Sequence, residues 1–189
     1  MNFNPEEFTE TQQKLFDTLQ FMAKLLIAGA VFQGILYIYP DTTPLQSVLA
    51  QIIGGMLGSA GIISQVDGIS VLTGQAEYVI TQDCLGWKSM AAFLGLIYAS
   101  TERTLEHLTF ILQGLVILVI ANIVRVYTTV VLAERGIISF ELIHGVLWRW
   151  SLTLLVLGLW IYWMKDLKER EPIFQQRIKE RARELTEKR

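Results

Sequence analysis

Three residues in separate apolar stretches have side chains that could together perform acyl-transfer chemistry: Cys84, Arg125 and His144. A thiol attacks carbonyl carbons as its thiolate, which positive neighbours or a helix amino terminus favour. An imidazole accepts and returns protons near neutral pH. A guanidinium can hold the oxyanion of a tetrahedral intermediate. We therefore predict that Cys84 is a nucleophile, His144 its base and Arg125 the oxyanion holder.

Polar neighbours of these residues fall at helical spacings. Asn122 precedes Arg125 by three residues, so both lie on one helix face, and Lys88 follows Cys84 by four. A charge inside a membrane helix costs about 2.5–3.5 kcal/mol on insertion scales and so calls for a functional explanation. Arg149 is either structural or a contact for the substrate backbone. The candidate supporting and substrate-binding residues are Asn122, Gly86, Lys88, Trp148 and Arg149.

Each member of the trio also has a plain structural interpretation. A lone cysteine in a membrane helix packs like a small apolar residue, and arginines near a span's end extend to lipid headgroups. A histidine at a helix start often acts as an interfacial cap. The combination favours catalysis. No metal or cofactor is expected, because the two histidines fall on opposite leaflets of the topology inferred below and no H-E-x-x-H occurs.

Four long apolar stretches must position these side chains. The chain has 189 residues, of which 52% are hydrophobic, and nine of its 16 Lys and Arg fall in 165–189. A hydrocarbon core of about 30 Å needs about 20 helical residues. The stretches are Phe21 to Tyr39, Gly86 to Tyr98, Leu108 to Val131 and Gly145 to Met164. We predict an all-α polytopic membrane protein with four transmembrane helices.

Two further segments lie between the first and second stretches. Large apolar residues in Pro44 to Ile63 recur at i, i+3, i+4 and i+7 with polar residues and glycines between them. One-sided apolarity favours a helix in the outer membrane interface, with a fifth span as the alternative. Residues 66–83 alternate around Thr73-Gly74-Gln75, which predicts a small β-hairpin.

The basic carboxyl-terminal tail orients the chain, because positively charged segments stay in the cytoplasm. Counting spans back from that tail brings Cys84, Arg125 and His144 to the outer leaflet. We divide the chain into a polar segment 1–20, which does not resemble a signal peptide, a membrane-embedded catalytic domain 21–164 and a charged cytoplasmic tail 165–189. The expected location is the plasma membrane, with a multi-pass topology and an extracytoplasmic site.

Three short motifs, in this order, resemble the exosortase/archaeosortase family of membrane cysteine transpeptidases. They are Q-D-C-L-G-W-K-S (82–89), N-I-V-R-V (122–126) and H-G-V-L-W (144–148). The resemblance covers about residues 45 to 165, and the short chain is more similar to archaeal-type members. Leu85 departs from the pattern, since the family has Ser or Thr there. The role of that hydroxyl is either vacant or filled by Ser89.

The resemblance implies both a reaction and partners. Members act on exported proteins that end in a sorting signal, which is a short motif, an apolar helix and a basic cluster. Cys84 would cleave near the motif, form a thioester and pass the acyl group to an amine such as that of a membrane lipid. No nucleic-acid partner is expected. The alternative is a non-catalytic membrane protein, a transporter subunit or assembly factor, in which Arg125, Arg149 and Lys88 bind an anionic ligand or headgroup.

Overall fold

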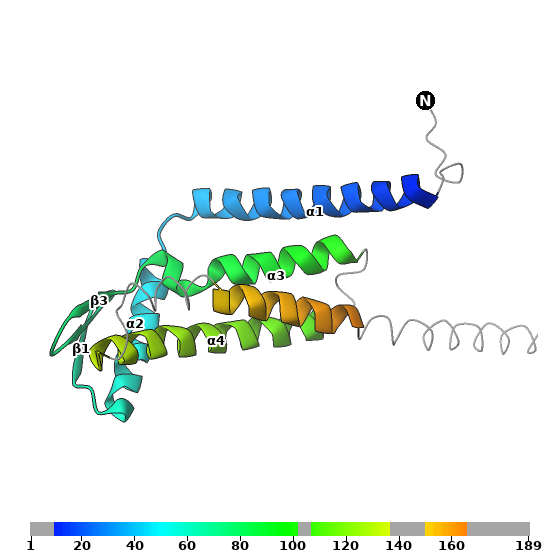
Figure 1. Ribbon diagram of the computed structural model, residues 1–189. Helices are drawn as coiled ribbons and strands as arrows, with labels where there is room; N and C mark the ends of the chain where they lie inside the picture. The colour runs from blue at the N-terminus through cyan, green and yellow to red at the C-terminus, as the bar shows by residue number, and fades with distance from the viewer. Residues whose placement is uncertain (1–9, 102–106, 137–149, 166–189) are drawn as a thin grey trace, which may run out of the picture.

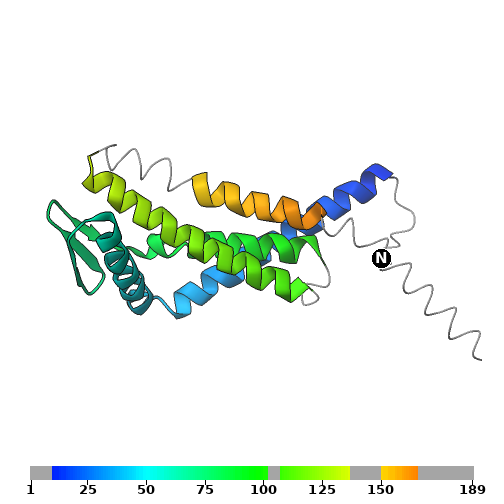
Figure 2. The same cartoon turned by 90° about the horizontal axis from the view of Figure 1, so that it is seen from below.

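The computed structural model describes residues 10–101, 107–136 and 150–165. Four helices run in roughly one direction in the view of Figure 1. They are α1 (Glu10–Ile38), α3 (Trp87–Ser100), α4 (Leu108–Glu134) and the helix Trp150–Lys165. The turned view of Figure 2 shows that α1 crosses α4 at an angle. Each of the four helices falls on one of the four predicted stretches, so the helical interpretation of those stretches is confirmed where the structure describes them.

Two of these helices, α1 and α4, are long and apolar enough to cross a membrane. In the described residues, α3 has 14 residues and Trp150–Lys165 is also shorter than the length of about 20 that a span needs. The count of four or five spans therefore stays a prediction. Helix α1 begins at Glu10, well before the apolar stretch at Phe21, so part of the polar segment 1–20 is helical.

Close packing between large and small residues holds the bundle together. Phe93 of α3 is completely buried, and a Cβ added to Gly114 of α4 would lie 2.3 Å from its ring. Gly114 therefore provides the space that the phenyl ring occupies. A shared apolar cluster joins α3, α4 and Trp150–Lys165; its buried members are Phe93, Ile97, Ile111, Leu118, Val156 and Trp163.

Helix α2 (Thr43–Leu57) lies across one end of the bundle rather than along it (Figure 1). Its 15 residues are about 22 Å long at 1.5 Å per residue, too short for a core of about 30 Å. Leu49 and Ile53 are buried against the protein, whereas Leu45 and Val48 are 62% and 53% exposed. Some apolar side chains of α2 thus pack against the protein and others face its surroundings. This division favours the interfacial position over a fifth span.

A three-stranded antiparallel sheet lies beside α2, in the order β1 (Ser64–Asp67), β2 (Ser70–Thr73), β3 (Glu77–Val79). The predicted hairpin is confirmed as β2 and β3, with Val71 opposite Tyr78. Strand β1 was not predicted, because only one of its four residues has an apolar side chain. The Gly68-Ile69 turn after Asp67, in which Gly68 has a φ of +58°, was the available signal for it.

The sheet is attached to the end of α4. The hydroxyls of Thr73 and Tyr78 both donate hydrogen bonds to the Glu134 carboxylate, that of Tyr78 at 3.3 Å. Val71 and Ile80 are buried, and both belong to an apolar cluster shared with α2 and α4. Because β3 leads straight into the cysteine turn, these contacts fix the approach of the chain to Cys84.

Candidate active site

Cys84 lies in a short 3-10 turn, η3 (Gln82–Leu85), between β3 and α3. Its backbone N–H donates to the carbonyl of Thr81 at 2.9 Å. Gly86 follows with a φ of +71°, and α3 begins only at Trp87. Cys84 therefore lies outside α3, because the left-handed glycine ends the cysteine turn before the helix starts.

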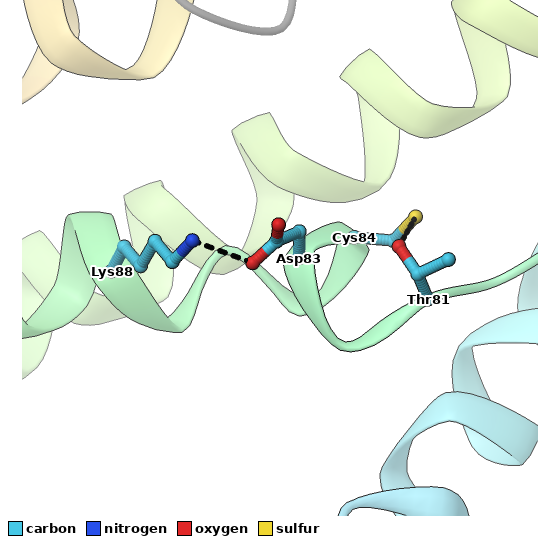
Figure 3. A network of polar contacts seen from close by, with 4 residues as sticks. All are labelled: Thr81, Asp83, Cys84 and Lys88. Atoms are coloured by element: carbon cyan, nitrogen blue, oxygen red, sulfur yellow. Dashed lines mark hydrogen bonds and ion pairs between the residues drawn. The ribbon is translucent and has the colours of Figure 1, made fainter. Parts of the chain in front are cut away.

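The Cys84 side chain is only 7% exposed and lies in apolar surroundings. Its neighbours in the cluster come from α2, the sheet and α4, and include Ile53 and Val126. The Thr81 hydroxyl is a polar neighbour, and its Oγ1 lies 3.4 Å from Sγ, within hydrogen-bond distance (Figure 3). The sulfur thus has a hydroxyl partner from its own turn in largely apolar packing.

Two buried amides hold the backbone on either side of the nucleophile. Gln46 of α2 donates from Nε2 to the carbonyl of Ile80 at 3.0 Å. Asn122 of α4 donates from Nδ2 to the carbonyl of Cys84 itself at 2.7 Å. The cysteine turn is therefore tied to both α2 and α4, and its position does not depend on the sheet alone.

Gly86 has a steric role in this arrangement. A Cβ at position 86 would lie 2.8 Å from Asn122 Cγ and 2.9 Å from its Oδ1, closer than real Cβ contacts. The left-handed backbone also disfavours any residue with a side chain. Gly86 therefore lets the Asn122 amide approach the cysteine turn. Its supporting role in this arrangement is steric rather than chemical.

Asn122 also connects the nucleophile to Arg125. Its Oδ1 accepts a hydrogen bond from Arg125 Nη2 at 2.8 Å, in agreement with the prediction that the two residues share a helix face. Arg125 is 6% exposed and interacts electrostatically with Cys84 and Asp83. A snorkelling arginine would instead extend to the surface. The structure thus brings Cys84, Asn122 and Arg125 together.

Lys88 is placed differently from the sequence-based expectation. Its Nζ forms an ion pair with Asp83 at 2.7 Å, both side chains are more than half exposed, and the ammonium lies 5.3 Å from the Trp87 ring centroid. Figure 3 shows this pair on one side of the turn and the Cys84–Thr81 pair on the other. The charge of Lys88 is therefore largely offset by Asp83, and its influence on the thiol stays a prediction.

The remaining predicted site residues, His144, Trp148 and Arg149, lie outside the described residues. Two positions that contact the cysteine segment were missed in the sequence, Thr81 and Gln46. The spacing of Thr81, three residues before Cys84, was a usable signal, since Thr hydroxyls often bond within such turns. Gln46 gave no signal, because its partner is a backbone carbonyl 34 positions away.

The fold and site together define a helical protein with apolar, membrane-type helices and a buried cysteine whose backbone carbonyl is linked through an amide to a guanidinium. A family model described as transmembrane exosortase matches residues 11–158. The chain belongs to this family, a group of membrane cysteine transpeptidases, and is a membrane protein. Neither a search of curated proteins nor one of solved structures finds a match.

Proposed function

We propose that the protein is a membrane-embedded cysteine protease and transpeptidase that cleaves a carboxyl-terminal sorting signal of exported proteins. The new carboxyl terminus is passed to an amine, such as that of a membrane lipid. Family membership supports transpeptidation in general. The observation that carries the assignment of the site is the hydrogen-bonded connection from Cys84 through Asn122 to Arg125.

In the first half of the reaction, the Cys84 thiol loses its proton to His144 and Sγ attacks the carbonyl carbon of the scissile bond. The negative charge that develops on the carbonyl oxygen is stabilised by Arg125, which is charged at any physiological pH. The protonated imidazole returns the proton to the leaving amine as the carbon–nitrogen bond breaks. A thioester on Cys84 and a released signal helix result.

In the second half, the acceptor amine attacks the thioester carbon and gives its proton to His144. The tetrahedral intermediate again places its oxyanion at Arg125. Collapse of the intermediate breaks the carbon–sulfur bond, forms an amide and regenerates the thiol. The apolar surroundings of Cys84 favour transfer to an amine over hydrolysis, because they limit access of water to the thioester.

Replacement of the nucleophile tests this proposal. Cys84→Ala should abolish processing of a co-expressed protein that ends in a motif, an apolar helix and a basic cluster. The readout is the size shift of that substrate on immunoblots, with variant and wild type present in membranes at equal amounts. Normal cleavage by a well-accumulated Cys84→Ala variant would overturn the proposal.

Capture of the intermediate separates transpeptidation from simple binding of an anionic ligand. A small amine such as hydroxylamine, added to membranes that contain wild-type enzyme and substrate, should release substrate as its hydroxamate. This product requires a thioester, so a protein that only binds a headgroup would not form it. Cys84→Ala is the matched control and should yield none.

A further inference from the structure

The hydroxyl of Thr81 lies within hydrogen-bond distance of the nucleophilic sulfur. Oγ1 lies 3.4 Å from Cys84 Sγ. Thr81 is the residue before η3, and its carbonyl accepts the Cys84 N–H at 2.9 Å. The same residue therefore contacts the cysteine through both its backbone and its side chain, which fixes the hydroxyl beside the sulfur.

The geometry points to Thr81 as a positioning residue that donates a hydrogen bond to the Cys84 thiolate, supplying the hydroxyl that Leu85 does not provide. This inference rests on the proposed function only for its consequence in catalysis. Ser89, the other candidate, lies in α3 beyond the Gly86 turn, whereas Thr81 is within the hydrogen-bonded turn of Cys84.

The direction of this hydrogen bond depends on the state of the sulfur. Beside a neutral thiol, either atom can donate. Beside a thiolate, the sulfur has no hydrogen, so the hydroxyl must donate. A donor to an ionised acceptor forms a stronger bond than one between neutral groups. Thr81 therefore stabilises the thiolate more than the thiol.

The charged groups near the sulfur do not replace the hydrogen bond from the Thr81 hydroxyl. Arg125 interacts electrostatically with Cys84, but one of its nitrogens is already engaged by Asn122. Lys88 and Asp83 form an exposed ion pair whose charges largely cancel. In the described residues, Thr81 Oγ1 is the hydrogen-bonding partner that the structure records on Sγ itself.

The pH dependence of Cys84 alkylation tests the inference without any substrate. Cys84 is the only cysteine in the chain, so a small thiol reagent reports on it alone. In Thr81→Val, the midpoint of the rate–pH curve should rise by about one pH unit, and alkylation at neutral pH should slow about tenfold. Thr81→Ser should restore the wild-type midpoint, because it restores the hydroxyl.

Matched variants separate this role from a loss of structure. Thr128→Val removes a hydroxyl that bonds the Val124 carbonyl and should leave the midpoint unchanged. A purely structural effect of Thr81→Val would alter the plateau rate at high pH, through access to the sulfur, without moving the midpoint. That outcome, or a midpoint moved by Ser89→Ala and not by Thr81→Val, would overturn the inference.

The alkylation assay also distinguishes failure of this inference from failure of the proposed function. If Thr81→Val moves the midpoint but the wild type processes no sorting-signal substrate, the inference stands and the proposed function fails. If the wild type processes substrate and Thr81→Val has a normal midpoint, the inference fails alone. If both hold, substrate processing at neutral pH should fall with the thiolate fraction in Thr81→Val and recover in Thr81→Ser.

Discussion

At the scale of single residues, the site depends on the side-chain amide of Asn122, which hydrogen-bonds through both its nitrogen and its oxygen. Asn122 donates from nitrogen to the Cys84 carbonyl and accepts at oxygen from Arg125. A carboxylate could only accept and an ammonium could only donate, so a side-chain amide is the group that fits both partners. Through this contact, the position of the guanidinium and that of the nucleophile are set by one side chain.

Arg125→Lys should reduce substrate processing at least about 100-fold, the loss seen when an oxyanion donor is removed elsewhere. Lysine keeps the charge but lacks the planar fork that can hold Asn122 and an oxyanion at once. Processing rates in membranes with matched enzyme amounts provide the measurement. Arg135→Lys is the control, because Arg135 is an exposed residue at the end of α4 that bonds the Ala60 carbonyl. Near-normal processing by Arg125→Lys would exclude the oxyanion role.

At the scale of secondary-structure elements, α2 and the sheet pack against the end of α4 and bury Cys84. The attachment includes one titratable pair, in which the Tyr78 hydroxyl donates to Glu134 at 3.3 Å. Burial, and then the negative charge of Glu134, raise the pKa of Tyr78 above its ordinary value of 10.0. The folded sheet thus favours the protonated phenol.

This pKa shift predicts how stability depends on alkaline pH. Because the pKa of Tyr78 is higher in the folded state, its contribution is complete below about pH 10 and is lost as the pH rises through the folded value. Thermal unfolding of purified protein in detergent should therefore show a falling midpoint above pH 10. Tyr78→Phe should show a smaller fall over the same range, since phenylalanine does not ionise. An identical fall in both proteins would contradict the assignment to Tyr78.

At the scale of the whole molecule, the site lies at the end of the bundle covered by α2 and the sheet (Figure 2). Charge distribution along the sequence predicts that this end faces outward and that the basic tail lies in the cytoplasm. Helix α2, with its apolar side chains divided between protein and surroundings, suits the predicted position at the boundary between lipid and water.

Single-cysteine labelling in intact cells checks this orientation. In a Cys84→Ala background, a cysteine at the exposed Gln75 in the β2–β3 turn should react with an impermeant reagent added outside. A cysteine at Glu187 in the basic tail should react only after the membrane is permeabilised. The reverse pattern would place the candidate site in the cytoplasm and contradict an extracytoplasmic reaction.

The sequence by itself determined the helices, the β2–β3 hairpin and the pairing of Asn122 with Arg125, because each depends on periodicity or on spacing within one element. It also determined the family, since its motifs are local. The tertiary structure decided which groups meet the nucleophile. Gln46 reaches Ile80 and Asn122 reaches Cys84 across 34 and 38 positions, and no local pattern encodes such contacts.

The tertiary structure also decided which nearby side chains contact the sulfur of Cys84. Lys88, which follows the cysteine by one helical turn in the sequence, is drawn to Asp83 because the Gly86 turn separates η3 from α3. Thr81, which was not among the predicted site residues, is brought to the sulfur by the turn that precedes α3. Residue types and order therefore identified the nucleophile, whereas backbone geometry decided its neighbours, because the 3-10 turn brings Thr81 to the sulfur and the left-handed Gly86 separates that turn from α3 and Lys88.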